Sequence, residues 1–264
     1  MPFFVRQDAG IFVPLEREMG EIILNRLVLA GELGVPGSVA VSEARISGID
    51  DPAVVFGADT LDLNGCLLLP GFVDLHIHGA VGVDVNDADV EGLFRIAAFL
   101  ARSGVTAWVP TLVPDSDENY RRAVGEIDRL MEMQEGRPVA QAVGVHYEGV
   151  FANEKMCGAL RPEFFKSGQW LVDGGRLPRL KRGIHLTTLA PEVEGGIAAV
   201  STLVDSGWTV AIGHSRSDVV TLDAALAAGA RHMTHFFNAM TGVHHRDIGV
   251  AGWGLNREAV TFDI

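Results

Sequence analysis

Residues 70–79 read PGFVDLHIHG, and this stretch decides the fold of the 264-residue chain. A short apolar run follows the break at Pro70-Gly71, and from here on similar runs alternate with segments of helical periodicity. Such alternation is typical of βα units whose parallel strands are buried on both faces. Strands are predicted over 72–78, 105–110, 139–146, 185–189, 209–213, 231–235 and 259–264, and helices over 89–103, 116–135 and 217–228.

Two architectures fit a chain of βα units, an open doubly wound sheet and a closed barrel. A dinucleotide-binding sheet would carry G-x-G-x-x-G after its first strand, but residues 78–87 read HGAVGVDVND. We therefore predict a (β/α)8-type TIM barrel of the metal-dependent hydrolase kind. Residues 70–264 are fewer than the roughly 250 usual for this fold and supply seven strands, so the barrel is expected to lack its last strand.

The residues before the barrel divide into two segments. Residues 1–20 match neither a helix nor a strand pattern and are expected to form a leader, a kind of segment that is often mobile. Residues 21–69 read as short β-rich runs separated by Gly, Pro and Asp, which predicts a small β-sandwich-like domain, incomplete without C-terminal strands.

Composition excludes several classes of partner. The chain has 21 Lys plus Arg against 34 Asp plus Glu, a formal net charge of −13, which argues against nucleic acid and against anionic membranes. It shows neither an apolar run of the roughly 18 to 20 residues that span a bilayer nor a secretory signal pattern. Its two cysteines, Cys66 and Cys157, have no paired spacing, as in proteins of a reducing compartment. A cytoplasmic location is expected.

Histidines gather at the predicted strand ends, where a barrel builds its site. His76 and His78 are two residues apart on one strand and so point to the same side, a geometry that can grip one metal ion. Alone, this pair is equally compatible with two structural histidines. His214 and His235 end two further strands, and Glu148 lies just past a third. Together they form a mixed N/O donor set for one or two divalent ions, Zn²⁺ or Fe²⁺, with the carboxylate able to bridge.

Six motifs carry a resemblance to a known family: PGFVDLHIHG, GVHYEG, TLAPE, AIGHS, THFFNAM and HHR. They resemble the amidohydrolase superfamily and, within it, the N-acetylglucosamine-6-phosphate deacetylases. The resemblance implies that Glu148, His214 and His235 hold the principal metal, and that His76 and His78 hold a second one. It further implies sugar-phosphate contacts from Asn238 and Ala239, and a homodimer in which Arg246 reaches the phosphate across the interface.

Departures from the family pattern concern the acyl pocket and the base. Where the family has a histidine that contacts the acetyl carbonyl, this chain has Leu160, so Ala159 and Leu160 would face the substrate and Arg161 could replace the lost donor. Val150 and the sequence RDIG are milder changes. The family's general-base aspartate, on the eighth strand, and the D-G-x-H segment before it are both absent, and Asp263 is not that base. The chain is therefore expected to be C-terminally truncated.

The resemblance implies an enzyme of amino-sugar catabolism that converts N-acetylglucosamine 6-phosphate into glucosamine 6-phosphate and acetate. One alternative is a related amidohydrolase acting on another acylated amine or a cyclic amide, although no lysine occupies the metal-bridging strand position of the cyclic-amide enzymes. The other alternative is a catalytically inactive metal-binding fragment.

Overall fold

The structure, a computed structural model, describes residues 70–264 in full and, before them, the backbone of seven strands. These strands are β1 (Phe4–Arg6), β2 (Phe12–Pro14), β3 (Glu21–Leu29), β4 (Glu32–Leu33), β5 (Gly37–Ser42), β6 (Arg45–Ile49) and β7 (Thr60–Leu69). They form one sheet in the order β2-β1-β7-β3-β5-β6, with β4 paired to β3. Two of these strands, β1 and β2, fall within residues 1–20, where the sequence showed no strand pattern. The remaining residues of 1–69 lie outside the described part, so the leader, the sandwich form and the domain bounds stay predictions.

By its contacts the chain divides into two compact units. The first contains Met1–Asp74, Phe94–Trp108 and Gln134–Gln141. The second contains Leu75–Leu93, Val109–Met133 and Ala142–Ile264, and every residue predicted to bind metal or substrate belongs to it. The candidate site can therefore be described within this second unit alone.

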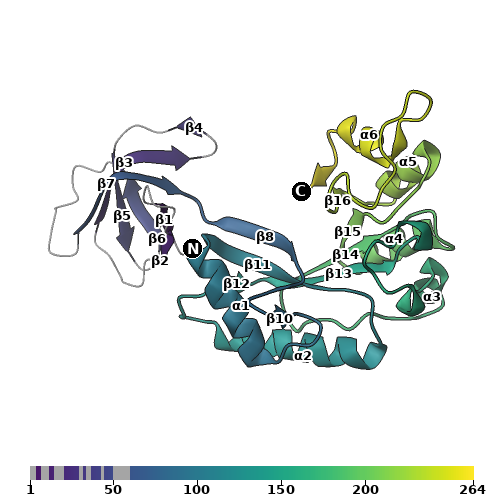
Figure 1. The fold of residues 1–264 in the computed structure, drawn as a ribbon, viewed down its shortest axis with the longest axis horizontal. Coiled ribbons are helices and arrows are strands. Elements are labelled where there is room, and N and C mark those ends of the chain that lie inside the picture. The colour runs from purple at the N-terminus through teal and green to yellow at the C-terminus, as the bar shows by residue number, and fades with distance from the viewer. Residues whose placement is uncertain are drawn as a thin grey trace. The chain divides into compact units, whose positions relative to one another are not determined.

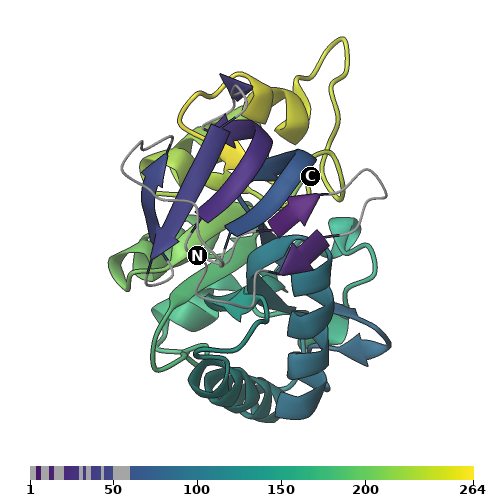
Figure 2. The same ribbon diagram turned by 90° about the vertical axis from the view of Figure 1, so that its left-hand side faces the viewer.

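A curled parallel sheet organises residues 72–264 (Figures 1 and 2). Its strands are β8 (Phe72–Ile77), β11 (Val105–Leu112), β12 (Gln141–Ala142), β13 (Gly144–Phe151), β14 (Ile184–Leu189), β15 (Thr209–Ile212), β16 (His232–Met233) and β17 (Thr261–Phe262). From β11 the order runs β13-β14-β15-β16-β17 with parallel pairing throughout, and β8 pairs with β11. This is the sheet of a TIM-barrel-like fold, as predicted.

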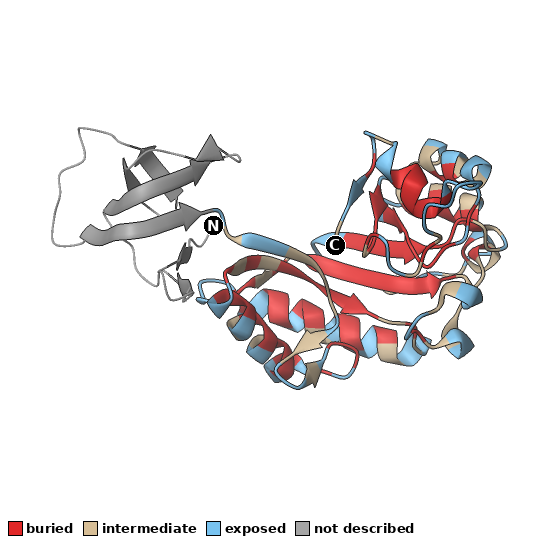
Figure 3. Cartoon of the chain, turned by 45° about the horizontal axis from the view of Figure 1, so that its top comes forward, coloured by how far each residue is buried: buried red, intermediate tan, exposed pale blue. Residues whose placement is uncertain are grey.

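Each of the seven predicted strands has a counterpart, but the third was misplaced. It was predicted over 139–146, whereas β13 runs from Gly144 to Phe151 and all eight of its residues are buried (Figure 3). The prediction ended at His146 because Glu148, two residues later, was taken for a loop residue. In the structure both polar side chains are buried, which a barrel interior permits when they are paired.

The predicted helices are α1 (Val90–Arg102), α2 (Asp117–Met133) and α5 (Val219–Ala227). Side-chain caps explain two of their starts, because Asp89 Oδ1 accepts the Gly92 N–H and Asp218 Oδ1 accepts the Thr221 N–H, both at 2.8 Å. Sequence patterns did not predict the other segments. They are α3 (Gly168–Val172), α4 (Gly196–Asp205), α6 (Gly249–Leu255), the hairpin of β9 (Gly79–Ala80) and β10 (Val83–Asp84), and 3-10 turns at Glu154–Met156 and Pro162–Phe164.

A layer of hydrogen-bonded polar side chains crosses the inside of the sheet. Thr111, His146, Thr188 and Thr234 come from neighbouring strands or strand ends and are fully buried. His146 Nε2 lies 2.7 Å from Thr188 Oγ1, which lies 2.6 Å from Thr234 Oγ1. Glu148 follows His146 by two residues on β13, so the same face of the strand carries both side chains. The layer thus supports the residues at the strand ends.

In the described chain, none of the helices has both the length and the apolar character that crossing a bilayer requires.

Candidate metal centre

Four segments deliver the five predicted metal ligands. His76 lies near the end of β8 and His78 directly after it, Glu148 lies within β13, His214 follows β15 and His235 follows β16. Because parallel strands end at one rim, these side chains meet at the C-terminal side of the sheet, where barrel sites are built. The structure therefore brings all five together.

Glu148 stands at the centre of this arrangement. Its Oε1 lies 2.9 Å from Nε2 of His214 and 2.9 Å from Nε2 of His235. Its Oε2 lies 3.0 Å from Nε2 of His78 and 3.4 Å from Nε2 of His76. The five residues thus form two groups of possible ligands that share one carboxylate, His76–His78–Glu148 and Glu148–His214–His235.

The donor chemistry fits metal ions better than it fits hydrogen bonds alone. Within each group the two histidine Nε2 atoms approach each other, to 3.0 Å for His76 and His78 and to 2.9 Å for His214 and His235. His214 Nδ1 lies 2.7 Å from the Met156 carbonyl, which only accepts, so Nδ1 carries the proton and Nε2 presents a lone pair. Glu148 Oε2 is buried without a hydrogen bond of proper geometry in the described part. Converging lone pairs and a buried carboxylate are what a divalent ion requires.

The electrostatics of the site follow from this convergence. Burial disfavours the charged carboxylate of Glu148, but the four imidazoles that surround it outweigh burial and hold its pKa far below the ordinary range. Burial likewise disfavours protonation of His78 and His235, yet Glu148 outweighs it and raises both pKa values. His146 behaves differently, since burial and then the charge of His76 lower its pKa well below 6.5. It stays neutral.

Two of the predicted ligands have backbone conformations that L residues rarely adopt. His214 has φ of 49° and His235 has φ of 37°, both in the left-handed region. Each such residue costs about 1–3 kcal/mol and persists only where the surroundings hold it. For His235 the holding group is Asp263, whose carboxylate accepts the His235 N–H and also lies 2.9 Å from His232 Nε2.

The hydrogen bond by which Asp263 supports His235 was not predicted from the sequence. Asp263 follows β17 rather than lying inside a strand, and both its oxygens have partners. Burial raises its pKa, but the His232 and His235 hydrogen bonds outweigh burial and lower it. Asp263 reaches His235 because β16 and β17 are neighbouring strands. The sequence pattern of residues 259–264 indicates a strand but does not indicate that contact.

Of the predicted acyl-pocket residues, Ala159 is exposed and Leu160 is buried. A Cβ built on Gly149 would lie 2.1 Å from Leu160 Cδ1, so the leucine packs under the turn that follows Glu148. Arg161 is also engaged: its Nη2 lies 2.8 Å from Asp115 Oδ2, and its guanidinium stacks 5.0 Å from the centre of the Phe164 ring. Leu160 therefore contributes packing, and Arg161 is tied to Asp115.

Of the predicted phosphate and sugar residues, Asn238 and Arg246 are exposed and Ala239 is half-buried. Asn238 follows His235 closely, with its N–H donating to the His235 carbonyl at 2.8 Å, and Ala239 has φ of 49°. Arg246 lies on the exposed loop after residue 240, where its N–H lies 3.4 Å from His244 Nδ1. The roles of these residues, and those of the five ligands, stay predictions.

Protons and metal compete for the imidazoles, which predicts opposite pH dependences for the metal-free and the zinc-loaded chain. Without metal, the pairing of charged His78 and His235 with Glu148 stabilises the fold fully below their ordinary pKa of 6.5 and is lost as pH rises through the raised pKa values. With zinc, neutral imidazoles are needed, so stability rises over the same window. Melting temperatures measured with chelator and with zinc should diverge above about pH 6.5. Parallel curves would contradict metal binding by these histidines.

Comparison with known proteins gives consistent results. No protein-family profile matches the chain. An N-acetylglucosamine-6-phosphate deacetylase of Lysinibacillus sphaericus is 32% identical over 232 residues, covering 86% of this chain and 58% of the relative. An N-acetylgalactosamine-6-phosphate deacetylase of Escherichia coli O157:H7 is 35% identical over 189 residues, covering 72% and 50%. The solved N-acetyl-D-glucosamine-6-phosphate deacetylase of Mycobacterium smegmatis superposes with a TM-score of 0.79 at 28% identity, covering 92% of this chain and 62% of that one. The chain spans about half to three fifths of the length of such curated relatives.

Proposed function

Because the chain belongs to the family of N-acetylglucosamine-6-phosphate deacetylases, we propose that it takes part in the metal-dependent hydrolysis of N-acetylglucosamine 6-phosphate. Water adds across the amide bond: the acyl carbon takes the hydroxyl, the C–N bond breaks and the nitrogen takes the proton. The products are acetate and glucosamine 6-phosphate.

One observation carries this proposal, the convergence of four imidazole Nε2 atoms on the buried Glu148 carboxylate. When bound there, a divalent cation such as Zn²⁺ or Fe²⁺ supplies Lewis-acid chemistry, lowering the pKa of water and polarising a carbonyl. Glu148, His214 and His235 would hold one ion, and His76 and His78 with Glu148 a second.

The other residues of the site orient these ligands. Met156 fixes the tautomer of His214 through its carbonyl. His146, buried and neutral, fills the space beneath His76, its ring 5.0 Å away, without adding charge. Asp263 holds the strained backbone of His235. These contacts fix the ligand side chains before substrate binds. Groups that need not reorient during the reaction lower its activation free energy.

Substrate recognition is proposed to rest on the turns beside the ligands. Asn238 and Ala239, which follow His235, are proposed to contact the sugar phosphate. Arg246, in an acidic chain, is proposed to anchor the phosphate of a substrate that is bound to the second copy of a homodimer. Its planar guanidinium group can form two parallel hydrogen bonds to phosphate oxygens.

An acetate-release assay tests the function. The purified chain, loaded with Zn²⁺ or Fe²⁺, would be given N-acetylglucosamine 6-phosphate, N-acetylgalactosamine 6-phosphate and unphosphorylated N-acetylglucosamine. Faster turnover of N-acetylglucosamine 6-phosphate than of unphosphorylated N-acetylglucosamine supports the proposal. N-acetylgalactosamine 6-phosphate is included because the relatives are named for both hexosamine epimers. Metal-dependent hydrolysis of none of these by the loaded chain would contradict it and would favour the alternative, a catalytically inactive metal-binding fragment.

Arg246 should contribute to phosphate binding. We expect Arg246→Ala to weaken binding of glucosamine 6-phosphate by roughly 10- to 100-fold, as loss of a charge-assisted pair of hydrogen bonds does, with glucosamine binding unchanged. Titration calorimetry measures both. Arg95→Ala, at an exposed position on α1, removes the same charge as a matched control. Equal losses for both sugars would show that Arg246 acts structurally.

A further inference from the structure

We propose that Glu192 is a positioning residue of the metal centre, whose carboxylate fixes the turn that carries His214. The inference rests on the proposed metal-dependent function of that centre. Glu192 ends the motif TLAPE, three residues past β14, and is not among the five predicted ligands. The evidence is a set of four hydrogen bonds that ties three loops to one carboxylate.

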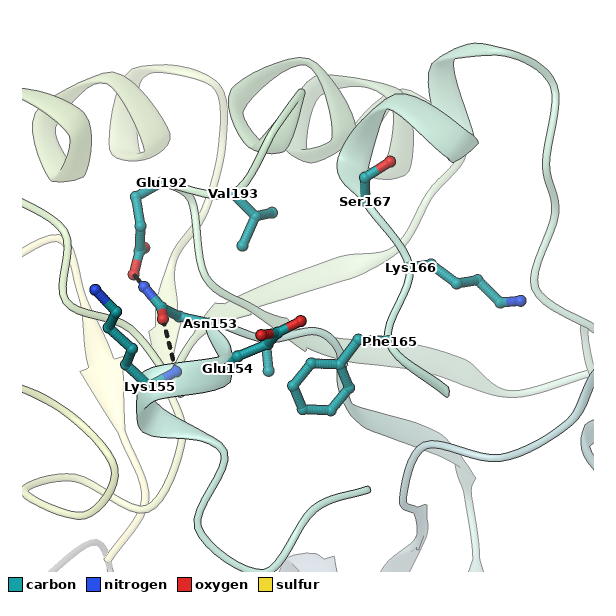
Figure 4. A pocket seen from close by; sticks show the side chains of 9 residues that line it. Asn153, Glu154, Lys155, Phe165, Lys166, Ser167, Glu192 and Val193 are labelled. Carbon is teal, nitrogen blue, oxygen red and sulfur yellow. Dashed lines mark hydrogen bonds between the residues drawn. The ribbon is translucent and has the colours of Figure 1, made fainter. Parts of the chain in front are cut away.

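Both oxygens of Glu192 accept two hydrogen bonds each. Oε1 accepts from Asn153 Nδ2 at 2.8 Å and from the Arg216 N–H at 2.6 Å. Oε2 accepts from Ser215 Oγ at 2.8 Å and from Ser217 Oγ at 2.5 Å. Figure 4 shows Glu192 and Asn153 reaching toward each other at the edge of a cavity of about 410 Å³. The lone pairs of the carboxylate are thereby used within the protein.

The donors lie on both sides of His214. Ser215, Arg216 and Ser217 follow it directly in the chain. Asn153 approaches from the other side: its own N–H donates to the His214 carbonyl at 3.0 Å, while its side chain holds Glu192. Glu192 therefore fixes the backbone on both sides of His214, and this backbone determines the direction of the His214 ring.

This restraint matters because the backbone of His214 is strained, with φ of 49°. A turn in this region relaxes to an ordinary conformation unless neighbouring groups hold it. Relaxation would move Nε2 away from Glu148 Oε1, now at 2.9 Å, and would disturb the shared carboxylate as well. Burial raises the pKa of Glu192, but its hydrogen bonds outweigh burial and lower it, so the charged form makes these contacts.

Zinc affinity, measured by competition with a chromophoric chelator, and the visible spectrum of the cobalt-substituted chain test this role without substrate. We expect Glu192→Ala to weaken binding of the metal held by His214 by roughly 10- to 100-fold, as loss of outer-shell partners does, and to shift the cobalt bands. Glu192→Gln should lose less, since its oxygen still accepts from Asn153 and Arg216 and its amide can donate to the serines.

Glu126→Ala is the matched control. Glu126 also accepts a backbone N–H, that of Val90 at 2.8 Å, and pairs with Arg129, but it contacts none of the site residues among its described hydrogen bonds. We expect it to lower the melting temperature and leave zinc affinity and cobalt bands unchanged. Unchanged affinity and spectrum in folded Glu192→Ala would overturn the inference. If that variant does not fold, wild-type affinity and spectrum in Glu192→Gln together with Ser217→Ala would overturn it instead. A wild-type chain that binds zinc but releases no acetate would contradict the proposed function and leave this inference standing.

Discussion

Replacing Glu148 by alanine is expected to remove both metal-binding groups at once, because each group uses one oxygen of this carboxylate. The Nε2 atoms of His76 and His78, and those of His214 and His235, would remain 2.9–3.0 Å apart with no anion between them. Metal affinity should fall by more than about 100-fold, beyond the loss that removal of an outer-shell partner causes. Metal content of the purified protein, measured by emission spectrometry, should drop toward zero.

Two companion variants separate charge from shape. Glu148→Gln keeps the size of the side chain but loses its charge, so its metal content should also fall. Glu194→Ala, at an exposed position, removes the same charge from the protein and should leave metal content unchanged. Wild-type metal content in folded Glu148→Ala would show that Glu148 is no ligand and that the histidines hold metal without it.

The sequence predicted the parts of the site that depend on local periodicity. Short apolar runs located the strands, and because parallel strands end at one rim, the sequence alone places His214 and His235 near His76 and His78. The approach of His214 and His235 to 2.9 Å agrees with that reasoning. Strand ends were less certain, and for this reason Glu148 was expected in a loop although it lies inside β13.

Contacts between distant residues could not be predicted in the same way. Leu160 packs beneath Gly149, because the intervening loop folds back under β13, and its expected contact with the substrate stays a prediction. Glu192 lies 23 to 25 residues from its serine donors and 39 from Asn153, and no periodicity connects such positions. Its motif was a signal only of family resemblance, and the hydrogen bonds explain what the glutamate does.

Gly79→Ala is expected to separate the two metal groups. Gly79 follows His78, has φ of 155° and lies in the tight hairpin formed by β9 and β10. A Cβ there would lie 2.0 Å from the Val83 carbonyl oxygen, so the backbone of the hairpin must move. The hydrogen bond from the Val85 N–H to the His78 carbonyl, now 2.8 Å, would be lost with it.

The clash is with backbone, which cannot rotate away, so we expect the metal-free chain to lose roughly 3–5 kcal/mol of unfolding free energy, the upper range for one substitution. The displacement concerns His78 and not the strands that carry Glu148, His214 and His235, so one metal ion per chain should be lost and the other retained. Gly82→Ala is the matched control: Gly82 lies between the same two strands with φ of 76°, but its Cβ would meet nothing within 4 Å. It should cost only the backbone strain of about 1–3 kcal/mol and keep both ions. Equal metal content in the two variants would mean that the position of His78 does not govern the second site, and His76 would then have to hold that ion with Glu148 alone.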